Sequence, residues 1–323
     1  MNNFKKVGLT ALAGSLAAIS VNAAEMTVSG ATMLTYTSED GSETTGNPYG
    51  MKTNLGFTAS GEVNGYTVSY MQTSADQFAG MSSARLSIDM GDMGTLAFDQ
   101  GSGSGLGTID DKTPTAAEEI WDGLDGATVG GLVGATGASG VWNYIHTVNN
   151  IKFNGAARKG SGTANADGAS SGAGQGAWDF ALTSDSMVDG VSMGAGYGEA
   201  EAGSNIGDNE HMTVFANYST GPVTLGVQVS EIDNAGQAAI DEDVQAWGVA
   251  FNVNENLSVS YGQRDVEYKK PTATNVTEEG EGVAVAYTVG SIKIAGNINE
   301  VTDNNGTKES KDSMTEIAVS FAF

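Results

Sequence analysis

The sequence predicts an all-β protein, a transmembrane antiparallel up-and-down β-barrel of about sixteen strands with a long constriction loop. Three observations predict this fold class. Apolar and polar residues alternate along sixteen short segments, the connections between them are alternately short and long, and the chain begins with a segment typical of secreted proteins. The composition agrees, because 46 glycines and only four prolines suit short strands joined by tight turns.

Residues 1–23 are predicted to be a signal peptide. Lys5 and Lys6 provide a positive start, an apolar run follows over residues 7–19, and Ala23 ends a short stretch suited to cleavage. The apolar run is too short to span a membrane as a helix. The mature chain is therefore expected to comprise residues 24–323 and to form a single barrel domain.

The mature chain is strongly acidic and lacks cysteine. Its formal net charge of −25 becomes −27 when the two lysines of the signal peptide are removed. An acidic surface repels nucleic acid, which we exclude as a partner, and suits contact with water and cations. Without cysteine the chain has no disulfide framework and no Cys-ligated zinc. No segment after residue 23 has the run of about 18 apolar residues that a membrane-spanning helix needs.

The predicted strands follow one another with regular spacing. Their lengths bracket the length that a tilted strand needs to cross a bilayer. The segments are residues 25–37, 51–63, 66–74, 81–90, 94–100, 139–147, 150–158, 176–185, 190–199, 210–219, 222–231, 243–253, 256–267, 281–289, 291–301 and 313–323.

The connections alternate in length, as in barrels with short turns at one rim and long loops at the other. The short turns contain residues that tolerate positive φ, such as Asn64 with Gly65, Asn149 with Asn150, and Gly290. Between them lie polar or Gly-rich loops over residues 38–50, 75–80, 101–138, 159–175, 200–209, 232–242, 268–280 and 302–312.

The two faces of the predicted strands differ in polarity. In the segment 222–231, four aliphatic residues alternate with Thr, Gly, Gln and Ser, and the last segment places Ile317, Val319, Phe321 and Phe323 on one face. A soluble β-sandwich would also alternate, with its apolar face turned inward. Three features favour a barrel whose apolar face meets lipid: the signal peptide, the alternation of short turns with long loops, and the small polar residues of the second face.

These features together resemble the Gram-negative general-diffusion porin family, and the Gly-rich acidic composition looks most like its alphaproteobacterial and marine members. The resemblance spans the whole chain, from the signal peptide through the long third loop to Phe323. It implies a location in the outer membrane, contact with lipid and lipopolysaccharide, and a homotrimer. It also implies that the terminal strand, with Val319, Phe321 and Phe323, is a signal read by the barrel-assembly machinery. The Pro-Glu-Phe-Gly-Gly-Asp loop motif of enterobacterial porins is absent, so residue roles are not transferred from that branch.

The candidate constriction is the long loop, residues 101–138, because a sixteen-strand barrel is too wide to be filled by its own side chains. In the porin family this third loop folds into the barrel. Residues 115–121 have helical character, with a capping box from Thr115 to Glu118. The acids predicted to line one side of the constriction are Asp110, Asp111, Glu118, Glu119, Asp122 and Asp125. An extracellular lid is the alternative interpretation of this loop.

Strand parity places most of the strand-borne basic residues on the inner face. The residues predicted to form a basic side of the pore are Lys52, Arg85, Lys152, Arg158 and Arg264. Opposite an acidic loop, they would create a transverse field that orients dipolar solutes. Alternatively, they only solvate a wide lumen.

The sequence therefore predicts a channel for passive diffusion of small hydrophilic solutes and ions, with a preference for cations. A substrate-specific channel and a secreted, Ca²⁺-binding adhesive β-protein remain as alternatives. Acidic segments at residues 40–43, 208–210 and 241–243 could hold Ca²⁺, although none has the spacing of a high-affinity site, and no other cofactor is expected. We expect no enzyme, because the only histidines, His146 and His211, are far apart and no hydrolase or metalloprotease motif is present.

Overall fold

The structure, a computed structural model, describes residues 25–40, 47–75, 81–124, 130–137, 139–160, 176–202, 206–236 and 238–323. The predicted signal peptide, residues 1–23, and the candidate residue Asp125 lie outside the described residues. Within the described part, no helix combines the length and the apolarity needed to cross a membrane.

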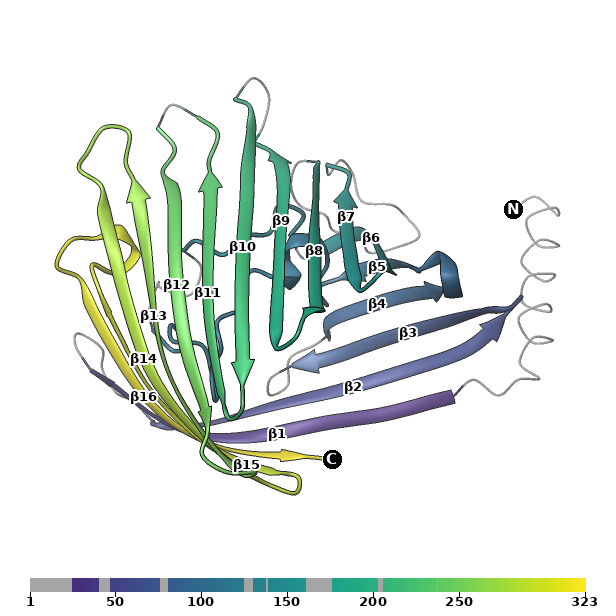
Figure 1. Cartoon of the computed structure of the whole chain (residues 1–323), viewed down its shortest axis with the longest axis horizontal. Helices are drawn as coiled ribbons and strands as arrows, with labels where there is room; N and C mark the ends of the chain where they lie inside the picture. The colour runs from purple at the N-terminus through teal and green to yellow at the C-terminus, as the bar shows by residue number, and fades with distance from the viewer. Residues whose placement is uncertain are drawn as a thin grey trace, which may run out of the picture.

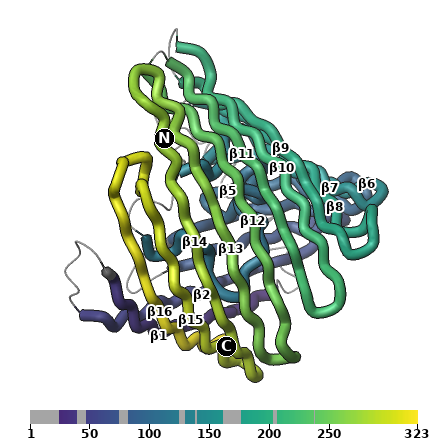
Figure 2. The backbone as a smooth tube through the Cα atoms, turned by 60° about the vertical axis from the view of Figure 1, so that its left-hand side comes forward, coloured from purple at the N-terminus to yellow at the C-terminus, as the bar shows by residue number. Residues whose placement is uncertain are grey.

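The described strands close into a barrel of sixteen antiparallel strands, in which each strand pairs with its neighbours in sequence and β1 pairs with β16. Figures 1 and 2 show the strands in chain order around the wall, with the first and last side by side. The strands are β1 (Glu25–Asp40), β2 (Tyr49–Val63), β3 (Tyr66–Ala75), β4 (Met81–Asp89), β5 (Thr95–Gln100), β6 (Ser139–Val148), β7 (Ile151–Arg158), β8 (Ala177–Val188), β9 (Val191–Glu201), β10 (Asp208–Thr220), β11 (Val223–Asp233), β12 (Asp241–Asn252), β13 (Leu257–Lys269), β14 (Val276–Val289), β15 (Ile292–Thr302) and β16 (Lys311–Ala322).

The predicted fold class is confirmed, and each predicted segment corresponds to one strand. Asn64, Asn149 and Asn150 have positive φ in their turns, as their residue type allows. The largest difference in a boundary is in the hairpin of β13 and β14. Its ladder continues to the pair of Tyr268 with Val276, beyond the predicted strand ends, because cross-strand pairing extends into residues whose local sequence reads as a loop.

Alternate side chains along the strands point to opposite sides of the wall. On β11, Leu225, Val227 and Val229 are 50–57% exposed on the outer face, whereas Gln228 is buried on the inner face. A continuous row of exposed aliphatic residues would be unfavourable in water and is expected where the wall meets acyl chains. The outer face is therefore the lipid-facing surface of the barrel.

The described residues of the loop between β5 and β6, which we call the constriction loop (residues 101–138), run along the inner wall. Figure 1 shows it behind β8 to β12. It begins with the 3-10 helix η2 (Gly105–Thr108), and the described part contains two other 3-10 helices, η1 (Gly91–Met93) and η3 (Asn304–Gly306). Two apolar clusters form between this loop and the wall, one against β8, β10 and β11 and the other against β15 and β16.

The helix predicted over residues 115–121 is wrong, because the structure has bends and a turn there. Thr115 Oγ1 accepts a hydrogen bond from Ala117 N at 3.3 Å and donates to Glu118 O at 2.7 Å. Ala116 N instead donates to Ser260 Oγ of the wall at 2.8 Å. Tertiary hydrogen bonds therefore take backbone groups that a helix would have used.

Candidate pore constriction

The entry to the constriction loop is held by a charged pair on the inner wall. Arg85 on β4 lies 3.8 Å from Asp99 on β5 and donates to Gly103 O at 3.1 Å. Asp99 also accepts hydrogen bonds from Ser102 N at 3.0 Å and from Ser104 Oγ at 2.8 Å. The Arg85 charge is thus neutralised at the start of the loop rather than opposed to its acids.

Asp179 on β8 joins the two ends of the described loop. This carboxylate is 2% exposed and accepts hydrogen bonds from Leu106 N at 3.0 Å and from both Thr136 N and Thr136 Oγ1 at 2.8 Å. A Cβ at Gly105 would overlap its Oδ1, so only glycine fits at this point. Asp179 therefore fixes the base of the loop against the wall.

Amide side chains of the wall hold the middle of the loop. Gln228 on β11 accepts from Lys112 N at 2.7 Å and donates to Ile109 O at 2.9 Å. Asn299 on β15 donates to Glu119 O at 3.1 Å and to Asp122 O at 2.9 Å. Because these contacts use backbone atoms, the carboxylates of the loop remain available to the lumen.

The structure brings five of the predicted acids together. Burial, and next the charge of Glu119, raise the pKa of the Asp111 carboxyl to about 6, although Thr113 N and Oγ1 donate to it at 3.3 Å and oppose the shift. Burial also raises the pKa of Asp110. Crowded carboxylates in a partly desolvated site are expected to bind protons or cations.

The other half of the acidic group lies nearer to lysines. Burial, and then the charges of Asp122 and Glu119, raise the pKa of Glu118, whereas Lys293 and Lys52 lower it. Burial and the charge of Glu119 likewise raise the pKa of Asp122, and Lys52 opposes the shift. These interactions place Lys52 and Lys293 within electrostatic reach of the acidic loop.

Lys52 and Lys293 belong to one row across the wall. The register pairs Lys52 with Met33, Met33 with Ser320, and Ser320 with Lys293, all on the inner face. With strands ~4.8 Å apart, three strand spacings separate the two lysines by ~14 Å. Lys293 was not among the predicted basic residues, although its position opposite the isoleucines of β15 indicated an inward side chain.

The remaining predicted basic residues do not join this row. Arg264 on β13 is 4% exposed and lies beneath the constriction loop, 3.7 Å from Glu278 and 4.7 Å from the ring centroid of Trp121. Lys152 is exposed on β7, two positions from the turn at Asn150. Strand parity assigned all these side chains to the inner face of the wall, but it could not predict which of them the constriction loop covers.

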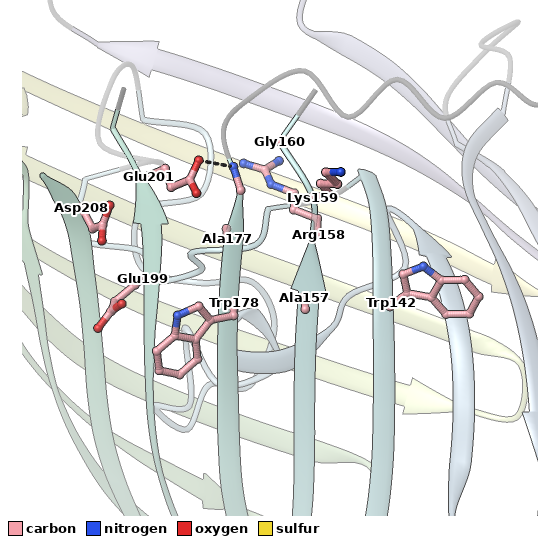
Figure 3. A pocket seen from close by; sticks show the side chains of 11 residues that line it. Trp142, Ala157, Arg158, Lys159, Gly160, Ala177, Trp178, Glu199, Glu201 and Asp208 are labelled. Atoms are coloured by element: carbon pink, nitrogen blue, oxygen red, sulfur yellow. Dashed lines mark hydrogen bonds between the residues drawn. The ribbon is translucent and has the colours of Figure 1, made fainter. Parts of the chain in front are cut away.

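Arg158 lies at the opposite end of β7, near the long-loop rim. It borders a pocket of about 530 Å³ with Lys159, Trp142, Trp178 and acids of β9 and β10 (Figure 3). A Cβ at Gly137 would lie 3.3 Å from Arg158 Nη1, so the guanidinium is close to the end of the constriction loop. It is therefore separated along the barrel axis from Lys152 on the same strand.

The predicted assembly residues lie at the seam of the barrel. Val319, Phe321 and Phe323 share the outer face of the last strand, and Phe321 is 43% exposed. Phe323 N donates to Gly30 O and Gly30 N to Phe323 O, both at 2.9 Å. A Cβ at Gly30 would lie 3.0 Å from the Phe323 ring. The last residue thus completes the pairing of β16 with β1.

Potential metal ligands do not cluster in the described part of the chain. No group of three or more His, Cys, Asp or Glu side chains there could hold a metal ion. Residues 41–43 of the predicted Ca²⁺ segment 40–43 lie outside the described residues, and Asp243 of the segment 241–243 pairs with Lys269 at 2.6 Å. His211 accepts a hydrogen bond from Gly134 N at 3.4 Å, while His146 stacks on Tyr144. Ca²⁺ binding remains a prediction.

Replacing Asp179 by alanine is expected to release the base of the constriction loop. The variant leaves the buried donors of Leu106 and Thr136 without their acceptor, at about 1–3 kcal/mol for each unsatisfied group. Single-channel recordings should show a larger and noisier conductance than the wild type. Asp185→Ala on the same strand is the matched control, because the Asp185 carboxylate is exposed and accepts a hydrogen bond from Ser192 Oγ at 2.6 Å rather than from the constriction loop. Identical recordings from both variants would show that Asp179 does not hold the loop.

The comparisons with known proteins agree with this architecture. The Gram-negative porin family model matches residues 8–323, whereas no curated protein sequence matches the chain. The fold is similar to that of a loop L8 deletion mutant of OmpT, an outer membrane protein of Vibrio cholerae, with TM-score 0.69 and 15% identity over 94% of this chain and 100% of that one.

Two further solved structures have similar folds. The trimer form of in-vitro folded OmpT of Vibrio cholerae has TM-score 0.66 and 14% identity, covering 94% of this chain and 100% of that one. An anion-selective porin from Comamonas acidovorans has TM-score 0.66 and 13% identity, covering 93% of this chain and 100% of that one. At these identities the likeness concerns the fold alone. The family match over nearly the whole chain shows that this protein belongs to the Gram-negative porin family, and the family and the fold point to an outer-membrane channel.

Proposed function

We propose that this porin passes small hydrophilic solutes and ions by passive diffusion, without chemistry, and that it prefers cations. The observation that carries the proposal is the acidic group of the constriction loop, Asp110, Asp111, Glu118, Glu119 and Asp122. The basic residues within its electrostatic reach are Lys52, Lys112, Lys293 and the buried Arg264, which interacts with Asp111. Arg85 and Arg264 are paired with Asp99 and Glu278, so they add little net positive charge to the lumen.

Three partners belong to the same proposal. The resemblance to porins and the similar trimer form of OmpT support a homotrimer. The exposed apolar outer face supports direct contact with outer-membrane lipid, including lipopolysaccharide. The position of Val319, Phe321 and Phe323 on the strand that closes the barrel supports their role as the signal for the barrel-assembly machinery.

The proposal is tested by the zero-current potential of the purified protein in a planar bilayer across a KCl gradient. The sign of the potential should indicate cation preference at low salt. The preference should weaken as salt approaches 1 M, where the Debye length is about 3 Å and fixed charges are screened. A potential of the opposite sign would reject cation preference while leaving the channel itself intact.

Cation preference is expected to fall between pH 7.5 and pH 5. Asp111 has a pKa of about 6, so its carboxyl loses its negative charge over this interval and attracts cations less. The zero-current potential measured at both pH values reports the change. Asp111→Asn should already show the weaker preference at pH 7.5 and should respond less to acid. An unchanged pH response in this variant would assign the titration to another group.

A further inference from the structure

The hairpin loop between β15 and β16, residues 303–310, packs against other strands of the barrel. Its 3-10 helix η3 contacts β13 and β14, and Asn304 and Gly306 are buried. Asp303, Asn305 and Gly306 all have φ between 52° and 64°. Positive φ is unusual for residues other than glycine, so tertiary contacts must hold this turn in shape.

The hairpin loop packs on a cluster of three buried side chains. Glu278 on β14 accepts a hydrogen bond from Asn305 N at 2.7 Å and lies 3.7 Å from Arg264. Tyr268 on β13 donates to the same carboxylate at 3.4 Å, and a Cβ at Gly306 would lie 2.8 Å from the Tyr268 ring. The exposed fractions of Arg264, Tyr268 and Glu278 are only 4%, 5% and 2%.

Two of the same side chains, Arg264 and Tyr268, also contact the constriction loop. Arg264 lies over the Trp121 ring at 4.7 Å and donates a hydrogen bond to Gly130 O. A Cβ at Gly130 would lie 2.2 Å from the Tyr268 hydroxyl, so the loop backbone sits directly on this residue. The cluster of Arg264, Tyr268 and Glu278 is therefore shared by two loops that are far apart in sequence.

A shared buried cluster couples the positions of the two loops. If the hairpin loop moves away, Glu278 loses the Asn305 N–H, and a buried charge that loses a partner is strongly destabilised. Arg264 and Tyr268, which hold Glu278, must then adjust, and both contact the constriction loop. Displacing the hairpin loop at the long-loop rim therefore changes the free energy with which the shared cluster holds the constriction loop in place.

We propose that the hairpin loop 303–310 positions the constriction loop through Arg264, Tyr268 and Glu278, and that loosening it shifts the channel between open and closed conductance states. The proposal rests on one part of the proposed function, namely that the constriction loop sets the conductance of the channel. It makes the hairpin loop, on the side of the long loops, a point from which the channel can be regulated.

Gly306→Ala tests the hairpin side of the coupling. The new methyl group would press on the Tyr268 ring and push the turn away from the cluster. Gly290→Ala is the matched control, because Gly290 has a similar φ of 58° but no atom within 4 Å of its added Cβ. In single-channel recordings, the ratio of closed to open time should change about fivefold or more in Gly306→Ala. Gly290→Ala should match the wild type.

Glu278→Gln tests the cluster itself with a nearly isosteric change. Glu279→Gln is its control, since Glu279 is the next residue on β14 and is exposed on the outer face. Both variants lose one negative charge, but only Glu278→Gln removes the partner of Arg264. The double variant Gly306→Ala with Glu278→Gln should shift gating no further than the larger single effect, because both changes act on one cluster.

Trp121 provides a readout that does not depend on conductance. With Trp142, Trp178 and Trp247 replaced by phenylalanine, the fluorescence of Trp121 alone reports whether Arg264 still covers it. Aqueous iodide should quench Trp121 more strongly in Gly306→Ala and Glu278→Gln than in their controls, in barrels whose heat-modifiable migration is normal. Unchanged quenching and gating in both variants would overturn the coupling. A wild type that forms no channel would instead refute the proposed function, and quenching would still decide the coupling.

Discussion

Neutralising four acids of the constriction loop is expected to abolish or reverse the ion preference of the channel. The variant replaces Asp111, Glu118, Glu119 and Asp122 by their amides and leaves Lys52 and Lys293 facing the narrowing. One unit charge 4 Å from an ion is worth about 1 kcal/mol in a water-like medium, or about a fivefold change in local cation concentration. The zero-current potential across a KCl gradient should therefore approach zero or change sign.

The control for this variant carries the same charge change outside the pore. Asp265, Glu279, Glu281 and Glu300 are exposed and border a pocket on the outer face of β13 to β15. Their four amides should leave the zero-current potential at its wild-type value, because the barrel wall separates them from the ion path. Equal effects of the two quadruple variants would mean that overall charge, and not the constriction loop, sets selectivity.

Replacing Phe323 by alanine is expected to remove most of the assembled barrel from the outer membrane. Phe323 ends the strand that pairs with β1, and its ring lies against Gly30. The variant removes the aromatic group that we propose the assembly machinery reads and loosens the last pair of the seam. The measurement is the heat-modifiable fraction of the protein in outer membranes.

Phe251→Ala separates a general loss of apolar surface from an effect of the seam. Phe251 is 39% exposed on the outer face of β12, away from the closure of the barrel. This variant should assemble normally. Refolding of Phe323→Ala in detergent then distinguishes two causes: normal refolding supports a lost assembly signal, and failed refolding indicates that the seam itself depends on the ring. Normal assembly of Phe323→Ala in cells would contradict both.

The strands of this protein were predictable because their information is local. Alternation with period 2 assigns each residue to a face, and the Asn and Gly turns with positive φ mark where the chain reverses. The acids of the candidate site could be chosen from the sequence, since the long loop carries them within a few residues of one another, and their role in a constriction stays a prediction. Its location inside the barrel followed from the family resemblance rather than from its own sequence.

The basic side of the candidate site could be predicted only in part from local sequence. Lys52, Arg85 and Arg264 all have inward parity, yet Lys52 stays within reach of the acids while the arginines are paired with Asp99 and Glu278. Asp99 and Glu278 lie on the strands next to those of the arginines. Strand parity does not reveal which basic residues the constriction loop covers. The role of Asp179, which joins residues 106 and 136, likewise depends on contacts between segments that are distant in sequence.

The sequence by itself determined the barrel, the face that meets lipid and the acidic character of the constriction loop, because residue periodicity, turn chemistry and composition act within a few residues. Only the tertiary structure decided the path of that loop, the loss of the expected helix near Thr115, and the shared cluster of Arg264, Tyr268 and Glu278. These features depend on hydrogen bonds and burial between separate segments, such as Ala116 with Ser260 and Gly130 with Arg264, which compete with and override local preferences.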